Sequence, residues 1–260
     1  QRFLAGLDAR SVFPSSKAVE GLAAFDQPTP EHPHAPAETL ALLDSAGSPA
    51  TVASAGRRYF GFVIGGSLPA SLAANWLAAA WDQNAGLTVA SPVGSKLEDV
   101  ASRWLLDLLG LPAESGVSYV TGGTMANFTA LAAARHAVLR SVGWDVEGQG
   151  LFGAPPIAVV VGEEVHVSLL KALSLLGLGR ERVVRVPVDD QGRMRADALP
   201  ALSGPTIVCI QAGNVNSGAF DPAGEICRLA HEAGAWVHVD SAFGLWAGAA
   251  PGRAHLVAGV

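Results

Sequence analysis

The chain has 260 residues, of which 50% are hydrophobic and 15% are charged, and its formal net charge is −6 at pH 7. This composition can bury a sizeable core, and its apolar surplus is typical of a surface partly covered by another subunit. The negative charge and the scattered Lys and Arg residues argue against a nucleic-acid partner, and no apolar run approaches the roughly 20 residues that a membrane span needs.

Cellular location can be inferred from the cysteines and from the first residues. Cys209 and Cys227 lie in apolar patterns, as expected for buried free thiols rather than for a disulfide framework. The first residues lack the basic, apolar and small-residue order of a signal peptide. We therefore expect a soluble, cytoplasmic protein.

Residues 1–56 are rich in Pro, Ala and Ser, with short helical patterns at Lys17–Phe25 and Ala37–Asp44. We interpret this region as a helical arm that packs on a partner subunit, and 57–260 as one large domain. The nearby His32 and His34 have no further ligand residues around them, so no metal site is expected.

Three segments follow the arm. Tyr59–Ser67 is aromatic and then glycine-rich, which allows either a loop that approaches a ligand or a plain hairpin or turn. Leu68–Asn84 has helical spacing. Ser95–Glu98 is a capping box and predicts a helix that starts there and ends at Gly110.

A strand is predicted at Val117–Val120, and a glycine-rich turn, Gly122, Gly123 and Thr124, leads from it into an alanine-rich helix ending near Leu139. A turn of this kind at a helix start presents free backbone N–H groups and the positive end of the helix dipole. It is not a nucleotide P-loop, because the spacing and the Gly-Lys pair are missing. We interpret it as a phosphate site, with a simple tight turn as the alternative.

From residue 157 onwards, strands and helices alternate. The strands are predicted at Ile157–Val161, Val183–Val186, Thr206–Ile210 and Ala235–Val239. The helices are predicted at His166–Leu176, Ala196–Leu202 and Pro222–Ala233, the last of them capped by Asp221. This alternation predicts an α/β fold with a mostly parallel sheet covered by helices on both faces.

Asp240 ends the last of these strands, at the edge where α/β proteins bind ligands, although a turn or capping aspartate would look the same. His166 follows another strand, where a core or helix-start histidine is the alternative. An anion site, an imidazole and a carboxylate together suit one flat, phosphorylated ring that contains nitrogen.

Several motifs then occur in a characteristic order. They are SPVGSKLEDVASRWLLDLLGLP at 91–112, VTGGTMAN at 120–127, the HxxxxK of 166–171, NSGAFDP at 216–222 and HVDSAF at 238–243. In these motifs the chain resembles the pyridoxal-phosphate-dependent decarboxylases that act on glutamate and aromatic amino acids. The resemblance covers 59–260 and implies the aspartate-aminotransferase-like fold, a homodimer with the active site at its interface, and conversion of an L-amino acid to an amine and CO₂.

The resemblance also implies residue roles. Gly123 and Thr124, with Gly122, would bind the phosphate, His166 would stack on the pyridine ring, and Asp240 would pair with the ring nitrogen and keep it protonated. His166 and Asp240 are thereby the predicted catalytic residues, and His166 would also assist protonation.

Other positions depart from the family pattern. Gln211–Val215 stands where the family often has a T-x-G-T-T run, so Gln211 or Asn214 would have to replace the hydroxyl contacts. In HVDSAF, Ser241 replaces a usual alanine, and Ala242 would pack beneath the ring.

The family's Schiff-base lysine, usually in a His-Lys pair beyond the aspartate strand, has no counterpart among these residues. The lysines of the chain are Lys17, Lys96 and Lys171, and Lys171 belongs to a different motif. We expect the sequence to be a fragment of a longer chain. The alternatives are another enzyme of the same fold, such as an aminotransferase, an aldolase-type lyase or a desulfurase, and a catalytically silent binding protein.

Overall fold

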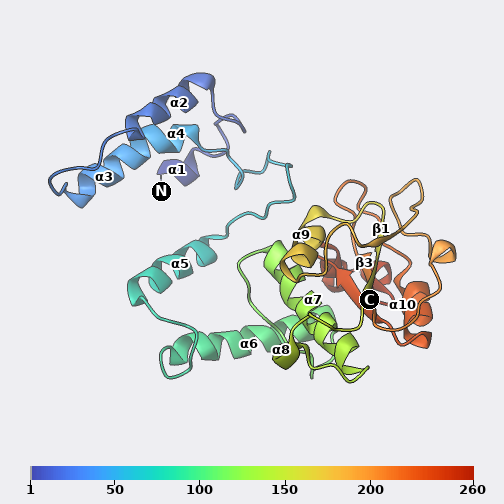
Figure 1. Ribbon diagram of the computed structural model, residues 1–260. Helices are drawn as coiled ribbons and strands as arrows, with labels where there is room; N and C mark the ends of the chain where they lie inside the picture. Colours follow the sequence, from blue (N-terminus) through green and yellow to red (C-terminus); the bar gives the residue numbers. More distant parts are fainter. Residues whose placement is uncertain (1) are drawn as a thin grey trace. The chain divides into compact units, whose positions relative to one another are not determined.

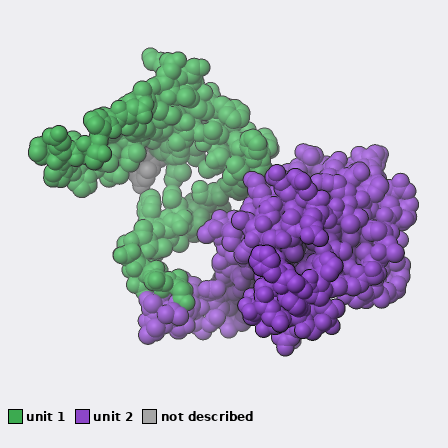
Figure 2. Space-filling model, in the orientation of Figure 1, with its two compact units in different colours: residues 1–86 green, residues 87–260 purple. Residues whose placement is uncertain are grey.

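A computed structural model describes residues 2–260 of the chain. These residues fall into two units, Gln1–Gly86 and Leu87–Val260 (Figures 1 and 2). The arm and domain predicted at 1–56 and 57–260 stay a prediction. In the part of the chain that is described, no helix combines the length and the apolarity needed to cross a membrane.

The first unit is helical. Its helices are α1 (Arg2–Ala5), α2 (Ser16–Glu20), α3 (Pro36–Leu42), α4 (Ser48–Ala50) and α5 (Pro69–Trp81). The helices predicted over these segments are confirmed, and Tyr59–Ser67 contains no strand, which removes the hairpin reading. Ala53 is the only buried residue among those described in this unit, so the unit has almost no core of its own.

The second unit opens with α6 (Pro92–Leu109), which starts earlier than predicted. The Ser91 hydroxyl accepts the Gly94 N–H at 3.2 Å, and Pro92 occupies the first helical position, where its missing N–H costs nothing. The predicted capping box is wrong, because the Ser95 hydroxyl instead donates to the Thr88 hydroxyl at 3.1 Å. The predicted end is confirmed, since Gly110 adopts a left-handed φ of 66°.

The strand predicted at Val117–Val120 is also wrong. This segment has no strand pairing among residues 2–260, and the side chains of Tyr119 and Val120 are exposed. A preference for β structure produces a strand only where a neighbouring strand offers hydrogen-bond partners and a surface to pack on.

The sheet has four parallel strands, β1 (Ala158–Gly162), β2 (Val184–Val186), β3 (Thr206–Gln211) and β4 (Trp236–Asp240). Their spatial order is β2-β1-β3-β4. All four correspond to strands predicted from the sequence. The chain passes from β1 to β2 on one side and from β3 to β4 on the other side. The position between β1 and β3 is therefore a topological switch point.

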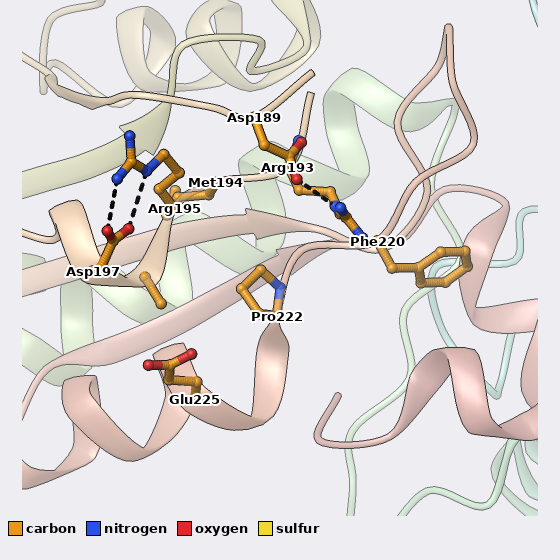
Figure 3. Close-up of a pocket in the computed structure, with 9 residues that line it drawn as sticks. Asp189, Arg193, Met194, Arg195, Asp197, Phe220, Pro222 and Glu225 are labelled. Carbon is orange, nitrogen blue, oxygen red and sulfur yellow. Dashed lines mark hydrogen bonds and ion pairs between the residues drawn. The ribbon is translucent and has the colours of Figure 1, made fainter. Parts of the chain in front are cut away.

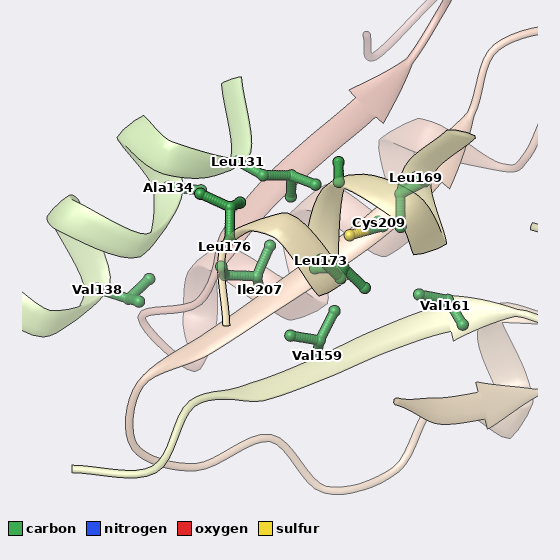
Figure 4. Packing of buried hydrophobic residues seen from close by; sticks show 11 residues of the cluster. Leu131, Ala134, Val138, Val159, Val161, Leu169, Leu173, Leu176, Ile207 and Cys209 are labelled. Carbon is green, nitrogen blue, oxygen red and sulfur yellow. The ribbon is translucent and has the colours of Figure 1, made fainter. Parts of the chain in front are cut away.

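Helices cover both faces of the sheet, as predicted. On one face α7 (Gly123–Arg140) and α9 (Val167–Leu175) pack on β1 and β3, and Figure 4 shows the side chains that meet in this layer. On the other face α10 (Ala223–Glu232) supplies Ile226 and Ala230 to a second core. The short helix α8 (Val146–Gln149) follows α7.

Two predicted helices in this region differ from the observed ones. The helix predicted at Ala196–Leu202 is a single 3₁₀ turn, Ala196–Ala198. Helix α10 begins after Pro222 rather than at it, because the Asp221 side chain bonds to other segments instead of capping the helix.

Candidate functional site

The carboxyl edge of the sheet gathers the predicted site residues. At the switch point the chain leaves β1 and β3 in opposite directions, and in α/β proteins ligands bind outside the carboxyl ends of the strands at such a point. Gln211 at the end of β3 lies opposite Asp240 at the end of β4 in the parallel register. Asp240 therefore lies at the same edge of the sheet, one strand away from the switch point.

The start of α7 is open and built for an anion. Gly122 precedes the helix with φ 149° and ψ 172°, a conformation that a side chain would strain. A Cβ atom built on Gly122 or Gly123 would meet nothing within 4 Å, so the backbone here is accessible. The first N–H groups of an α-helix have no acceptor within the helix, and half-buried Thr124 adds a hydroxyl.

Asn127 connects this helix start to Asp240. Its amide nitrogen Nδ2 lies 3.0 Å from Asp240 Oδ2. Because Asn127 is four residues after Gly123, the carboxylate lies about one turn, roughly 6 Å, along α7 from the open N–H groups. The predicted anion site and the predicted carboxylate are thus brought together.

His166 belongs to the same cluster. It caps α9, and its Nδ1 lies 2.7 Å from the Ser168 hydroxyl and accepts the Ser168 N–H at 3.2 Å. Asn127 Nδ2 lies 3.1 Å from that hydroxyl. A continuous chain of hydrogen bonds therefore runs from His166 through Ser168 and Asn127 to Asp240, while the imidazole itself is exposed.

Gln211 and Asn214 are linked to Glu164 instead. The Gln211 Nε2 donates to the Glu164 carbonyl at 3.2 Å, and the Asn214 Nδ2 donates to the Glu164 carboxylate at 3.0 Å. Asn214 Oδ1 also accepts the N–H groups of Asn216 and Ser217. Both side chains lie at the correct edge of the sheet, but a ligand would have to compete with these protein partners.

Ala242 is exposed in the turn that follows β4. Its neighbour Phe243 fixes this turn against the loop after β3. A Cβ atom on Gly213, which has φ 100°, would lie 2.6 Å from the Phe243 ring. The two loops at this edge of the sheet are therefore packed against each other.

Two buried groups surround the Asp240 carboxylate. Burial lowers the pKa of His238 to about 4, although the nearby Asp240 charge opposes this shift. Burial, and then the Asp240 charge, raise the pKa of the Cys209 thiol above its ordinary value. At neutral pH both groups are uncharged, so neither neutralises Asp240.

Asp221 is a third buried group and has a structural role. Its two carboxylate oxygens accept the backbone N–H groups of Met194 and Gln211, each at 2.7 Å. Burial raises the pKa of this carboxyl against the effect of the two hydrogen bonds. The side chain joins the turn after β2 to the end of β3.

Three residues of the cluster were not predicted as site residues. Asn127 heads the buried face of α7, four residues before Leu131, where an apolar residue is normal. His238 lies two residues before Asp240, so both side chains share one face of β4. Ser168 lies within the first turn of α9. A polar side chain on an apolar face was the available signal for the first two.

A cavity of about 460 Å³ lies elsewhere in the second unit (Figure 3). None of the predicted site residues lines it. Both of its arginines pair with aspartates of the same cavity: Arg193 lies 2.7 Å from Asp189, and Arg195 lies 2.7 Å from Asp197. We therefore place the functional site at the carboxyl edge of the sheet.

Comparisons with known proteins agree with the fold. Residues 52–260 match the model of the pyridoxal-dependent decarboxylase conserved domain. The chain is 29% identical over 195 residues to acidic amino acid decarboxylase GADL1 of Homo sapiens, covering 72% of this chain and 36% of that protein. It is 31% identical over 227 residues to tryptophan decarboxylase 1 of Oryza sativa subsp. japonica, covering 79% of this chain and 43% of that protein.

Among solved structures, Oryza sativa TDC with PLP and tryptamine superposes with a TM-score of 0.85 and 25% identity. The match covers 99% of this chain and 58% of that one. The chain thus spans about a third to three fifths of the length of these relatives.

Proposed function

The chain belongs to the family of pyridoxal-dependent decarboxylases, and from this premise we propose that it forms the cofactor-binding part of an enzyme that decarboxylates an L-amino acid. The cofactor would be pyridoxal 5′-phosphate and the products an amine and CO₂. One observation carries the proposal: Asp240, His166 and the open start of α7 are joined through Asn127 at the switch point of the sheet.

The residues present fit this cofactor. Its phosphate needs N–H donors and a positive environment, which the start of α7 offers around Gly122, Gly123 and Thr124. Its pyridine nitrogen needs an anion to stay protonated, which Asp240 offers. Ala242 is small and exposed beside Asp240, so it leaves room for a flat ring.

When bound, the cofactor would supply an electron-withdrawing ring that accepts the electron pair left on the reacting carbon when the bond to CO₂ breaks. The chain's own contribution is to hold that ring and its proton. Asp240 would keep the proton on the ring nitrogen, and His166 would hold the ring and limit its tilt. Selective stabilisation of the charge that develops at the reacting carbon accelerates the reaction, rather than tight binding alone.

Gln211 and Asn214 are proposed as further cofactor contacts, reached by exchange of their bonds to Glu164. Lys17, Lys96 and Lys171 are exposed, and none of them takes part in the hydrogen bonds described above. We assign none of these lysines to the covalent attachment of the cofactor.

We further propose a cytoplasmic homodimer. The first unit buries almost none of its apolar side chains, and Phe60, Phe62 and Trp76 are 93%, 85% and 67% exposed. Exposed apolar surface on this scale marks a site of protein association. The negative charge and the absence of a basic cluster do not favour a nucleic-acid partner.

Product analysis with each common L-amino acid tests the proposed reaction. The protein, expressed from its complete gene and supplied with pyridoxal phosphate, should release equal amounts of CO₂ and amine from one amino acid or a few related ones. Asp240→Ala should abolish this release, and Asp197→Ala, an exposed carboxylate away from the site, should not. Formation of a keto acid without CO₂ would favour an aminotransferase, and no product from any substrate would favour a silent binding protein.

A further inference from the structure

Asn127 occupies the centre of the site cluster although it is only 5% exposed and lies on a helix face that is otherwise apolar. Its Nδ2 contacts Asp240 and Ser168, and its Oδ1 lies 2.8 Å from His238 Nε2. One amide thus bonds to residues of β4 and α9 as well as belonging to α7. A buried amide with partners at every position is a costly arrangement to replace.

The orientation of this amide follows from its partners. An ionised carboxylate only accepts hydrogen bonds, so the Asn127 nitrogen must face Asp240 and its oxygen must face His238. That oxygen only accepts, so His238 has to donate from Nε2. Burial lowers the pKa of His238 to about 4, so the ring is neutral at pH 7 and its single proton is on Nε2.

The same reasoning fixes the protons at His166. Asn127 has two N–H groups on Nδ2, and it directs one to Asp240 and one to the Ser168 hydroxyl. Because that hydroxyl accepts from Asn127, its own hydrogen is available to His166 Nδ1, 2.7 Å away. The Ser168 backbone N–H also points to Nδ1. Nδ1 is therefore an acceptor, and a neutral His166 carries its proton on Nε2.

The Asp240 carboxylate is oriented by the same contact. Its Oδ2 is occupied by Asn127, whereas its Oδ1 has no hydrogen-bond partner within 2–260. The Asn127 amide donates a hydrogen bond to the carboxylate but cannot transfer a proton to it. It therefore stabilises the ionised form of Asp240, the form that would pair with a protonated ring nitrogen.

We infer that Asn127 is a positioning residue that sets the direction of the Asp240 carboxylate and the tautomer of His238, and that orients the Ser168 hydroxyl toward His166 Nδ1. This inference rests on the proposed function, since it assigns Asp240 Oδ1 to the ring nitrogen of the cofactor. It also assigns the donor and the acceptor in each hydrogen bond that links the Asp240 carboxylate to the His166 imidazole.

The tautomers can be measured in the chain without cofactor. Long-range ¹⁵N–¹H NMR of histidine-labelled protein should show the protons of His166 and His238 on Nε2. Ser168→Ala keeps the backbone N–H that points to Nδ1, so it should leave the proton of His166 on Nε2 and shift only the Nδ1 resonance, and it should leave His238 unchanged. Ser174→Ala, which removes an exposed hydroxyl from the same helix, should change neither. A proton on Nδ1 of either histidine in the unaltered chain would overturn the inference.

Ligand binding supplies the second measurement. Pyridoxamine 5′-phosphate has the ring and phosphate of the cofactor but no aldehyde, and its fluorescence allows titration. Asn127→Asp keeps the size of the side chain and an acceptor for His238, so the fold should persist, as circular dichroism can check. It removes the donor to Asp240 and adds a like charge, and it should weaken binding by about tenfold or more.

The outcomes separate the two proposals. Unchanged affinity in Asn127→Asp would overturn the role of Asn127 and leave the proposed function intact. No binding by the unaltered chain would count against the proposed function, and the NMR measurement would still decide the role of Asn127. Asn127→Leu, which removes every hydrogen bond of the amide, should free the tautomer of His238, and a proton that stays fixed on Nε2 of His238 in this variant would also contradict the inference.

Discussion

Replacement of Asp221 by Asn tests how the edge of the site is held together. The carboxylate accepts two backbone N–H groups, from Met194 and Gln211, at 2.7 Å each. An asparagine has one acceptor oxygen, so its NH₂ group would face the second N–H at close range. A hydrogen bond to a charged group is worth about 1.5–3 kcal/mol, and a buried donor left without an acceptor costs a similar amount.

Part of that loss is offset, because burial raises the pKa of Asp221 and the neutral amide avoids the cost of burying a charge. We expect Asp221→Asn to lower the free energy of unfolding by about 2 kcal/mol. Urea denaturation followed by tryptophan fluorescence measures this change, and hydrogen exchange should accelerate at the Met194 or Gln211 amide. Asp197→Asn, at an exposed carboxylate, is the control. A change in Asp221→Asn no larger than in this control would refute the reasoning.

Three further results are expected. His238 has a folded-state pKa of about 4 and an ordinary value of 6.5, so the unfolded chain binds its proton first. The contribution of neutral His238 to the free energy of unfolding is therefore complete above pH 6.5, and about 3 kcal/mol of it is lost as the pH falls to 4. Urea denaturation at several pH values measures this loss, and His238→Gln should not show it. Leu173→Ala, in the core, should cost about 2–5 kcal/mol in a thermal melt, whereas Leu175→Ala on the exposed face of the same helix should cost less than about 1. Gly213→Ala should destabilise, because φ is 100° and an aromatic ring fills the Cβ position, whereas Gly224→Ala in α10 should stabilise by about 0.5–1 kcal/mol; equal effects would contradict this assignment.

The sheet could be predicted from the sequence because its strands carry a strong local signal. Val159–Val161 and Ile207–Ile210 are continuous apolar runs between turn residues, and such runs are typical of strands buried on both faces. Val117–Val120 is also rich in residues that favour strands, but it has no neighbouring strand among residues 2–260, so its strand prediction failed. The start of α6 failed for a different reason: Ser91 with Pro92 and Ser95 with Glu98 are both valid start signals, and their competition is decided by tertiary contacts.

The site was only partly predictable for the same kind of reason. Asp240 and His166 could be proposed as site residues because strand ends in α/β proteins point to the ligand crevice. No comparable rule about sequence position identifies Asn127, because its role depends on β4 and α9 lying beside α7 in space. Asp221 was interpreted as a helix cap because Asp-Pro often starts a helix, whereas its partners are Met194 and Gln211, 27 and 10 residues away.

Titration of the chain with pyridoxamine 5′-phosphate tests the cofactor site most directly, because this compound cannot attach covalently to the exposed lysines. We predict saturable binding of one molecule per chain, weaker binding of pyridoxamine without its phosphate, and a loss of about 10- to 100-fold in Asp240→Ala. Asp197→Ala should bind as the unaltered chain does. Absence of saturable binding, or equal affinity in Asp240→Ala, would contradict the assignment of this edge of the sheet as the cofactor site.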